Sequence, residues 1–186
     1  MDLSSLFSLM NKVALITGAN KGIGKEIARQ LGLLGYTVVL TARDPNAGAK
    51  AVDELVAAGC DAHTVALEVT SPSDIANLAK YLKEKFGKLD ILVNNAGIAI
   101  EWDGQATNPE KVRRTLETNL IAPYAITEAL VPLLSLSDDA RVINHSSQLG
   151  SIDAAEKMWQ YISGFMTVGY ARSEERRVGK ECRSRW

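Results

Sequence analysis

The sequence predicts a doubly wound α/β domain, in which helices cover both faces of a parallel sheet. Five short apolar runs rich in Val, Ile and Leu recur along the chain, as expected of strands that are buried on both faces. Between these runs lie stretches in which apolar residues recur at the spacing of one helix face. Strands that alternate with helices are typical of βαβ units, so we expect one domain built on a parallel sheet.

Each expected strand is bounded by turn residues or charges, and the five strands are residues 13–17, 37–42, 62–67, 89–94 and 141–146. Two of the four helices between them have a clear start, because Ser71 and Asn108 are good N-cap residues and each precedes a proline. Gly35 and Gly87 follow apolar helical stripes and suit the C-terminal cap of a helix.

Composition narrows the class of protein. Of 186 residues, 46% are hydrophobic and 23% are charged, which is ordinary for a globular domain. The net charge of −1 argues against a nucleic-acid partner, and no apolar run approaches the roughly 18 residues that a membrane span needs. The cysteines, Cys60 and Cys182, lack the spacing of a metal or redox motif. We expect a cytoplasmic protein with no metal, nucleic-acid or membrane partner.

A glycine-rich turn follows the first expected strand and runs directly into a helix. Glycine lets the backbone turn tightly and approach a pyrophosphate closely, and the helix N-terminus supplies free N–H donors with partial positive charge. In this strand–turn–helix context the turn predicts a dinucleotide-phosphate site. Its expected members are Thr17, Gly18, Asn20, Lys21, Gly22, Ile23 and Gly24.

The spacing of this turn, T-G-x-x-x-G-x-G, resembles the short-chain dehydrogenase/reductase family, and most closely its monomeric carbonyl reductases. Residues 40–44 (Leu-Thr-Ala-Arg-Asp) and 92–98 (Leu-Val-Asn-Asn-Ala-Gly-Ile) carry the same resemblance, which covers about residues 13–171. It implies a Rossmann-type NADP-binding domain over residues 1–171 that is truncated after about five strands. It also implies that the backbone beside the adenosine belongs to Glu68, Val69, Asn94, Ala96 and Gly97.

The end of the second expected strand indicates which nicotinamide cofactor is bound. Enzymes that use NAD usually carry an acid there, which bonds the ribose 2′-hydroxyl and would repel a 2′-phosphate. Here the matching residue is Ala42, followed by Arg43, and Lys21 lies in the glycine turn. Two cations and no acid favour NADP(H), although both cations would also suit a solvated surface with Asp44 as a partner.

The resemblance implies that a small-molecule aldehyde or ketone is reduced by hydride transfer from NADPH, with a tyrosine as general acid. Asn119 matches the helix asparagine that orders a proton-relay water, and Ser147 matches the strand-end serine that holds the substrate oxygen. The tyrosine is expected to be Tyr170. Tyr161 is the alternative, but Phe165 then stands where the family has lysine.

Two neighbouring positions depart from the family pattern. His145 stands where the family often has an apolar residue, and we interpret it as a strand-end side chain and not as a ligand. The lysine of the Tyr-x-x-x-Lys motif would occupy position 174, where the chain has Glu174. A carboxylate raises the pKa of a nearby phenol instead of lowering it, so the printed chain is expected to be a poor enzyme.

Residues 172–186 differ in composition from the rest of the chain, with six basic and three acidic residues and no apolar period. They resemble the translation of a sequencing adapter. We therefore expect a non-native or disordered tail, with the genuine sequence ending near Ala171. The alternative is a basic arm for a nucleic acid or another partner.

Other functions remain open at this point. The chain could be a non-catalytic NADP-binding or regulatory protein, or a 3-oxoacyl reductase that acts on a carrier-bound thioester. A lysine at the genuine position 174 would favour an enzyme over a binder. By resemblance the protein is a monomer if it is like the carbonyl reductases and a homo-oligomer otherwise.

Overall fold

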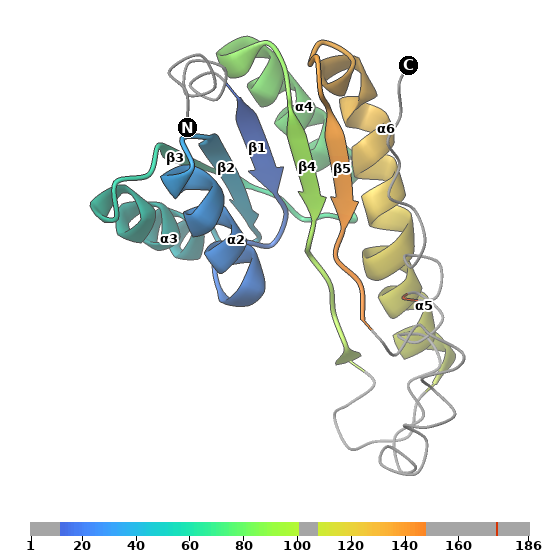
Figure 1. Ribbon diagram of the computed structural model, residues 1–186. Helices are drawn as coiled ribbons and strands as arrows, with labels where there is room; N and C mark the ends of the chain where they lie inside the picture. Colours follow the sequence, from blue (N-terminus) through green and yellow to red (C-terminus); the bar gives the residue numbers. More distant parts are fainter. Residues whose placement is uncertain (1–11, 101–107, 148–173, 175–186) are drawn as a thin grey trace.

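The computed structural model describes residues 12–100, 108–147 and 174 (Figure 1). Within these ranges five parallel strands form one sheet in the order β3-β2-β1-β4-β5. The strands are β1 (Val13–Ile16), β2 (Thr37–Ala42), β3 (Ala62–Ala66), β4 (Ile91–Asn94) and β5 (Arg141–Asn144). The predicted strand positions are confirmed, although most strands are one or two residues shorter than expected.

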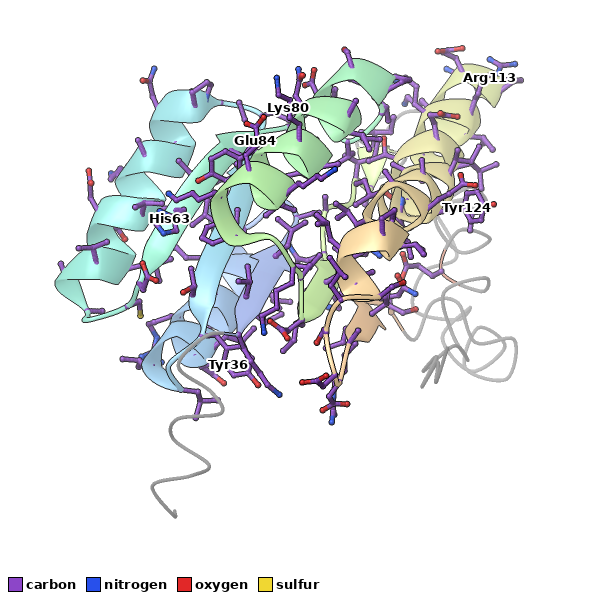
Figure 2. The ribbon with its side chains drawn as sticks, turned by 90° about the horizontal axis from the view of Figure 1, so that it is seen from above. Tyr36, His63, Lys80, Glu84, Arg113 and Tyr124 are labelled. Carbon is purple, nitrogen blue, oxygen red and sulfur yellow. The ribbon has the colours of Figure 1, made fainter. Side chains whose placement is uncertain are left out.

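The helices alternate with the strands, as the sequence predicted. They are α2 (Gly22–Leu33), α3 (Pro45–Ala57), α4 (Pro72–Phe86), α5 (Pro109–Leu116) and α6 (Ala122–Leu134), with the π-helical turn η2 (Glu117–Ile121) between the last two. Helices α2 and α3 pack on one face of the sheet, and α4 and α6 pack on the other. Polar and large side chains such as Lys80, Glu84 and Tyr124 project outward from α4 and α6 (Figure 2).

Two apolar cores lie on either side of the sheet, and β1 contributes to both. Val13 and Leu15 pack with α4 and α6, whereas Ala14 and Ile16 pack with α2 and α3. All four side chains are at most 4% exposed. A strand that is buried on both faces must be apolar at every position, which explains why the sequence reads as a continuous apolar run.

The helix ends follow the chemistry that the sequence predicted. The Ser71 hydroxyl accepts a hydrogen bond from the Asp74 backbone N–H at 3.3 Å, and Asn108 Oδ1 accepts one from the Lys111 N–H at 3.0 Å. Gly87 ends α4 in the left-handed conformation, with φ of 74°. These three caps are confirmed.

The turn η2 is a feature that the sequence did not predict in the helical segment that begins after Asn108. The Ala122 N–H donates to the carbonyl of Glu117, five residues earlier, and Pro123 follows at once. Proline has no N–H, and its ring would crowd the carbonyl of Asn119 in a regular α-helix. The wider π turn accommodates the proline and buries Asn119 completely.

Candidate functional site

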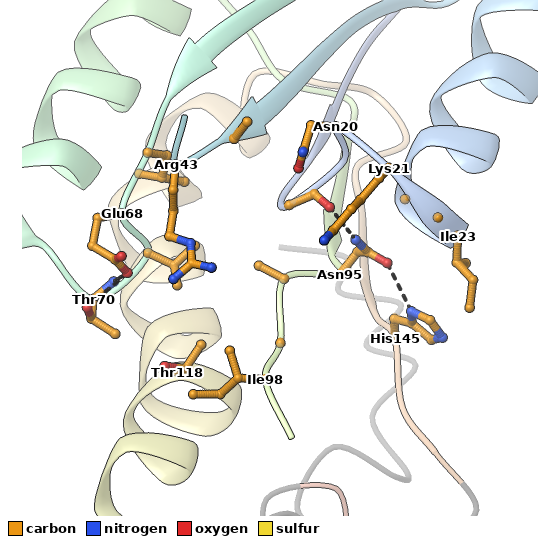
Figure 3. Close-up of a pocket in the computed structure, with 18 of the residues that line it drawn as sticks. Asn20, Lys21, Ile23, Arg43, Glu68, Thr70, Asn95, Ile98, Thr118 and His145 are labelled. Carbon is orange, nitrogen blue, oxygen red and sulfur yellow. Dashed lines mark hydrogen bonds between the residues drawn. The ribbon is translucent and has the colours of Figure 1, made fainter. Parts of the chain in front are cut away.

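An open cleft of about 610 Å³ lies at the carboxyl ends of the strands (Figure 3). The chain passes from β1 to β2 and β3 on one side and returns to β4 and β5 on the other, so the strand order reverses between β1 and β4. Ligands of open α/β sheets bind at such a reversal. Eleven of the residues predicted for the site line this cleft: Gly18, Asn20, Lys21, Gly22, Ile23, Gly24, Arg43, Glu68, Val69, Ala96 and Gly97.

Thr17 is not among the lining residues and lies directly behind them, 1% exposed. Its Oγ1 accepts hydrogen bonds from the backbone N–H groups of Asn95 and Ala96, each at 3.0 Å. The hydroxyl also lies 3.4 Å from the Val93 carbonyl, to which it donates. Thr17 therefore joins the end of β1 to the end of β4, and the predicted cofactor contact stays a prediction.

Asn94, another predicted residue, is also buried behind the cleft, with 1% exposed. Its Nδ2 donates to Asn144 Oδ1 at 2.9 Å and to Thr127 Oγ1 at 3.2 Å. These bonds connect the ends of β4 and β5 to α6. The side chain thus fixes the spacing of the two strands on which the far side of the cleft is built.

The prediction missed Asn95, which is the residue that ties the glycine turn to β4. Its Nδ2 donates to the backbone carbonyls of Thr17, at 2.9 Å, and of Gly18, at 3.2 Å. Gly24 comes so close that a Cβ built on it would lie 2.4 Å from that nitrogen. Gly24 is therefore required for the approach of α2 to Asn95. The signal for Asn95 in the sequence was its place in the Asn-Asn-Ala-Gly motif of residues 94–97.

The N-terminus of α2 opens into the cleft without a side-chain cap. Helices α3, α4 and α5 are capped by Asp44, Ser71 and Asn108, whereas α2 has neither a capping side chain nor an acid in its first turn. Its backbone N–H groups and the helix dipole therefore face the cleft. Such an end favours an anion such as phosphate.

Two exposed cations, Lys21 and Arg43, add to this positive end of the cleft. Ala42, at the end of β2, also lines the cleft and brings no negative charge. The set of donors fits a ligand with several phosphates, one of them close to β2.

The loop after β3 forms the wall beside Arg43. The Glu68 carboxylate accepts hydrogen bonds from the Thr70 hydroxyl at 3.1 Å and from the Thr70 N–H at 3.3 Å, so it is held within its own loop. Asp74 accepts the Glu68 N–H at 3.0 Å. This bond, followed by one from the Ser71 hydroxyl, lowers the pKa of Asp74 below its ordinary value. The predicted residue Glu68 thus belongs to a loop that α4 anchors.

Of the residues predicted to be catalytic, Asn119 and Ser147 are described, and neither is among the lining residues of the cleft. Asn119 lies behind the cleft, where its side chain bonds the backbone of Ile98, which lines the cleft. Ser147 lies three residues past β5, partly buried, and is not among the lining residues. Tyr170, its alternative Tyr161 and residues 172–186 other than Glu174 fall outside the described residues.

Glu174 is described and is 2% exposed. Its backbone carbonyl lies 3.4 Å from the hydroxyl of Ser146, which donates to it. Position 174 therefore lies beside the segment that follows β5 and contains Ser147.

His145 was expected within the last two residues of the fifth strand; it follows β5 directly and lines the cleft. Its Nδ1 lies 3.1 Å from Asn95 Oδ1. In the described ranges no cluster of three His, Cys, Asp or Glu side chains could hold a metal ion. None of the helices described has both the length and the apolar character to cross a membrane.

Comparison with known proteins agrees with this geometry. Residues 12–163 match the family described as short chain dehydrogenase. Among curated relatives, short-chain dehydrogenase/reductase 1 from Saponaria officinalis is 39% identical over 170 residues, which cover 79% of this chain and 56% of that protein. Carbonyl reductase [NADPH] 3 from Rattus norvegicus is 40% identical over 144 residues, which cover 77% and 51%. The chain belongs to the short-chain dehydrogenase family.

A solved structure is similar over most of the chain. A metagenomic short-chain oxidoreductase in complex with NADP is 34% identical, with a TM-score of 0.70, and the match covers 83% of this chain and 79% of that one. The chain itself spans 56% and 51% of the lengths of the two curated relatives above.

Proposed function

We propose that this chain is the cofactor-binding part of an oxidoreductase that uses NADPH to reduce a carbonyl group to an alcohol. The observation that carries the proposal is the uncapped N-terminus of α2, which opens into the cleft between Lys21 and Arg43. NADP(H) differs from NAD(H) by one phosphate on the adenosine ribose, and the end of β2 has Ala42 and Arg43 where an NAD enzyme usually has an acid. The similar short-chain oxidoreductase in complex with NADP and the relative named carbonyl reductase [NADPH] 3 both support NADP(H) as the cofactor.

Different residues of the cleft would bind different parts of NADP(H). The N–H groups of the glycine turn and of the first turn of α2 would bind the pyrophosphate. Arg43, with its planar guanidinium, would grip the 2′-phosphate, and Lys21 would add a point charge. Glu68 and Val69 would lie beside the adenine. When bound, the cofactor supplies the hydride.

The protein would contribute the proton and the position of the substrate. We assign the proton donor to Tyr170 and the hydrogen bond to the substrate oxygen to Ser147, on the resemblance to the family. A phenol with its ordinary pKa of about 10 is a poor proton shuttle near neutral pH, so it needs a neighbouring cation. Asn119 would act by fixing Ile98 in the cleft wall, and through this contact it would position the substrate side of the site.

A second function is favoured by one observation. Position 174 lies beside the segment that contains Ser147, and the residue there is a glutamate instead of a lysine. A protein with that residue would bind NADPH and catalyse little, as a cofactor-binding protein would. Binding and turnover must therefore be measured separately.

Calorimetry of the chain with NADPH and with NADH tests the proposal. We expect NADPH to bind more tightly, and Arg43→Gln to weaken NADPH binding by about tenfold, the effect of one lost charge-assisted bond, without weakening NADH binding. Arg141→Gln is the matched control, since Arg141 lies at the start of β5, away from the cleft, and pairs with Asp139. Equal affinity for NADH and NADPH would refute the cofactor assignment, and failure of both to bind would refute the function.

A further inference from the structure

His145 lies at the end of the cleft that none of the functions assigned above uses. Figure 3 shows Arg43, Glu68 and Thr70 on one side of the cleft, with His145 and Ile23 on the other. The first side belongs to β2 and β3, and His145 follows β5, at the opposite edge of the described sheet. An imidazole here presents a hydrogen-bonding group to whatever part of a ligand lies beyond the phosphates.

The hydrogen bonds of Asn95 determine which nitrogen of His145 carries a proton. Asn95 Nδ2 donates to the carbonyl oxygens of Thr17 and Gly18. If the oxygen and nitrogen of the Asn95 amide were exchanged, its oxygen would face the two carbonyl oxygens, and none of the three could donate. The orientation of the Asn95 amide is therefore fixed. Its Oδ1 therefore faces His145 Nδ1 at 3.1 Å and can only accept. Nδ1 must be the donor.

The neutral ring of His145 then carries its proton on Nδ1, and Nε2 is an acceptor. The other histidine of the chain has the opposite arrangement. His63 Nε2 lies 3.2 Å from Asp61 Oδ1, to which it donates, and His63 Nδ1 lies 3.0 Å from Lys85 Nζ, from which it accepts. The two histidines are thus predicted to be opposite tautomers, and each serves as a reference for the other.

We propose that His145 Nε2 accepts a hydrogen bond from the nicotinamide nucleoside half of the bound dinucleotide, from a ribose hydroxyl or the carboxamide N–H. The inference rests on the proposed function, because it takes the adenosine half to lie beside Arg43. A dinucleotide spans the point where the strand order reverses, so its other nucleoside lies on the side of β4 and β5. His145 is then a binding residue that the glycine turn orients, through Asn95.

The tautomer can be tested in the free protein, without activity. Long-range ¹H–¹⁵N NMR spectra distinguish a protonated from an unprotonated ring nitrogen, and the sequence has two histidines, so His63→Gln assigns both. We expect the proton of neutral His145 on Nδ1 and that of His63 on Nε2, and we expect NADPH to shift the His145 Nε2 signal. A proton on Nε2 of His145, or no shift of that signal with NADPH bound, would overturn the inference.

Two substitutions of His145 test its two ring nitrogens separately, through their effects on NADPH affinity. In His145→Asn the amide can still donate to Asn95 Oδ1, but nothing reaches the place of Nε2, whereas His145→Gln keeps an acceptor near that place. We expect His145→Asn to weaken NADPH binding by about five- to tenfold, as for one hydrogen bond, and His145→Gln to weaken it less. Adenosine 2′,5′-bisphosphate, which lacks the nicotinamide half, should bind equally well to all three proteins.

The outcomes distinguish this inference from the proposed function. If the unaltered chain binds neither NADPH nor the bisphosphate, the proposed function fails. If it binds both and His145→Asn binds NADPH as tightly as before, only the role of His145 fails. If His145→Asn loses affinity equally for NADPH and for the bisphosphate, the role of His145 is also refuted. His145 would then act on the glycine turn and not on the nicotinamide half.

Discussion

Asn119 binds both backbone polar groups of Ile98, a residue 21 positions earlier in the chain. The Ile98 N–H donates to Asn119 Oδ1 at 2.8 Å, and Asn119 Nδ2 donates to the Ile98 carbonyl at 2.8 Å. The asparagine is fully buried in the π turn before α6, and Ile98 lines the cleft. A strand would make the same pair of bonds with a neighbour, so Asn119 fixes one wall of the cleft as another strand would.

Replacing this asparagine should loosen the wall. We expect Asn119→Leu to lower the free energy of unfolding by about 2–4 kcal/mol, because the partly buried N–H and C=O of Ile98 both lose their partner. Amide hydrogen exchange at Ile98 should become faster. Asn77→Leu, on the exposed side of α4, is the matched control and should change neither quantity. Unchanged exchange at Ile98 in Asn119→Leu would contradict the assignment.

Thr17 offers a second test, in which the shape of the side chain is kept. Thr17→Val removes the Oγ1 that accepts the N–H groups of Asn95 and Ala96, at nearly constant volume. We expect a loss of about 2–4 kcal/mol in urea unfolding, since two largely enclosed donors lose their acceptor. Thr17→Ser retains the hydroxyl and should lose about 1 kcal/mol, the contribution of one buried methyl group. Equal losses in the two variants would show that packing, and not hydrogen bonding, makes Thr17 important.

Much of the fold could be predicted because its signals are local. Ser71 and Asn108 cap the helices that follow them, and the apolar run of β1 reflects burial on both faces. The turn from Gly18 to Gly24 was predicted because its glycines, the preceding strand and the following helix are adjacent in the sequence. Each of these inferences needs only neighbouring residues and the period of one element.

The contacts that organise the cleft could not be predicted in this way. Asn95 reaches the backbone of Thr17 across 78 positions and His145 across 50. The π turn around Asn119 joins α5 to α6 and accommodates Pro123, in the first turn of α6. Periodicity does not encode such pairings, so it could not predict that Thr17 and Asn94 lie behind the cleft wall. Their contact with the cofactor stays a prediction.

A substitution at Gly24 tests whether the close approach of α2 to Asn95 requires a residue without a side chain. A Cβ at this position would lie 2.4 Å from Asn95 Nδ2 and 3.0 Å from Ala19 Cα. We expect Gly24→Ala to push Asn95 away from the glycine turn and to weaken NADPH binding at least tenfold in calorimetry. Gly35→Ala is the control: its φ of 91° strains an alanine by about 1–2 kcal/mol, but no atom lies within 4 Å of the new Cβ. It should lower stability and leave NADPH affinity unchanged.

His63, on the edge strand β3 (Figure 2), predicts how stability depends on pH. Burial, followed by the charge of Lys85, lowers the pKa of His63 below its ordinary value of 6.5, against the opposing effect of Asp61. Just below pH 6.5, His63 binds a proton more readily in the unfolded chain than in the folded one. The free energy of unfolding therefore rises with pH in this range and falls on acidification. His63→Gln should flatten this dependence in urea unfolding between about pH 5.5 and pH 7. A folded state that gains stability on acidification over that range would contradict the assignment.

Position 174 lies beside the candidate site and also belongs to residues 172–186, whose composition differs from the rest of the chain. Glu174 is 2% exposed, and its carbonyl is bonded to Ser146, the neighbour of the proposed catalytic Ser147. A carboxylate at this place disfavours the phenolate of a nearby tyrosine, whereas a lysine favours it, and the resemblance of residues 172–186 to a translated adapter gives an independent reason to doubt the glutamate.

We therefore expect the gene, amplified from source DNA and read past codon 171, to encode lysine at position 174. The protein translated from that gene should oxidise NADPH in the presence of aldehydes or ketones. The same protein with glutamate at position 174 should bind NADPH but turn over roughly a hundredfold more slowly, since a phenol whose pKa is not lowered is a weak proton donor near neutral pH. If residues 172–186 are encoded in frame as printed, the cofactor-binding protein becomes the better description of this chain, because the group that lowers the pKa of the phenol is then absent from the place where the chemistry requires it.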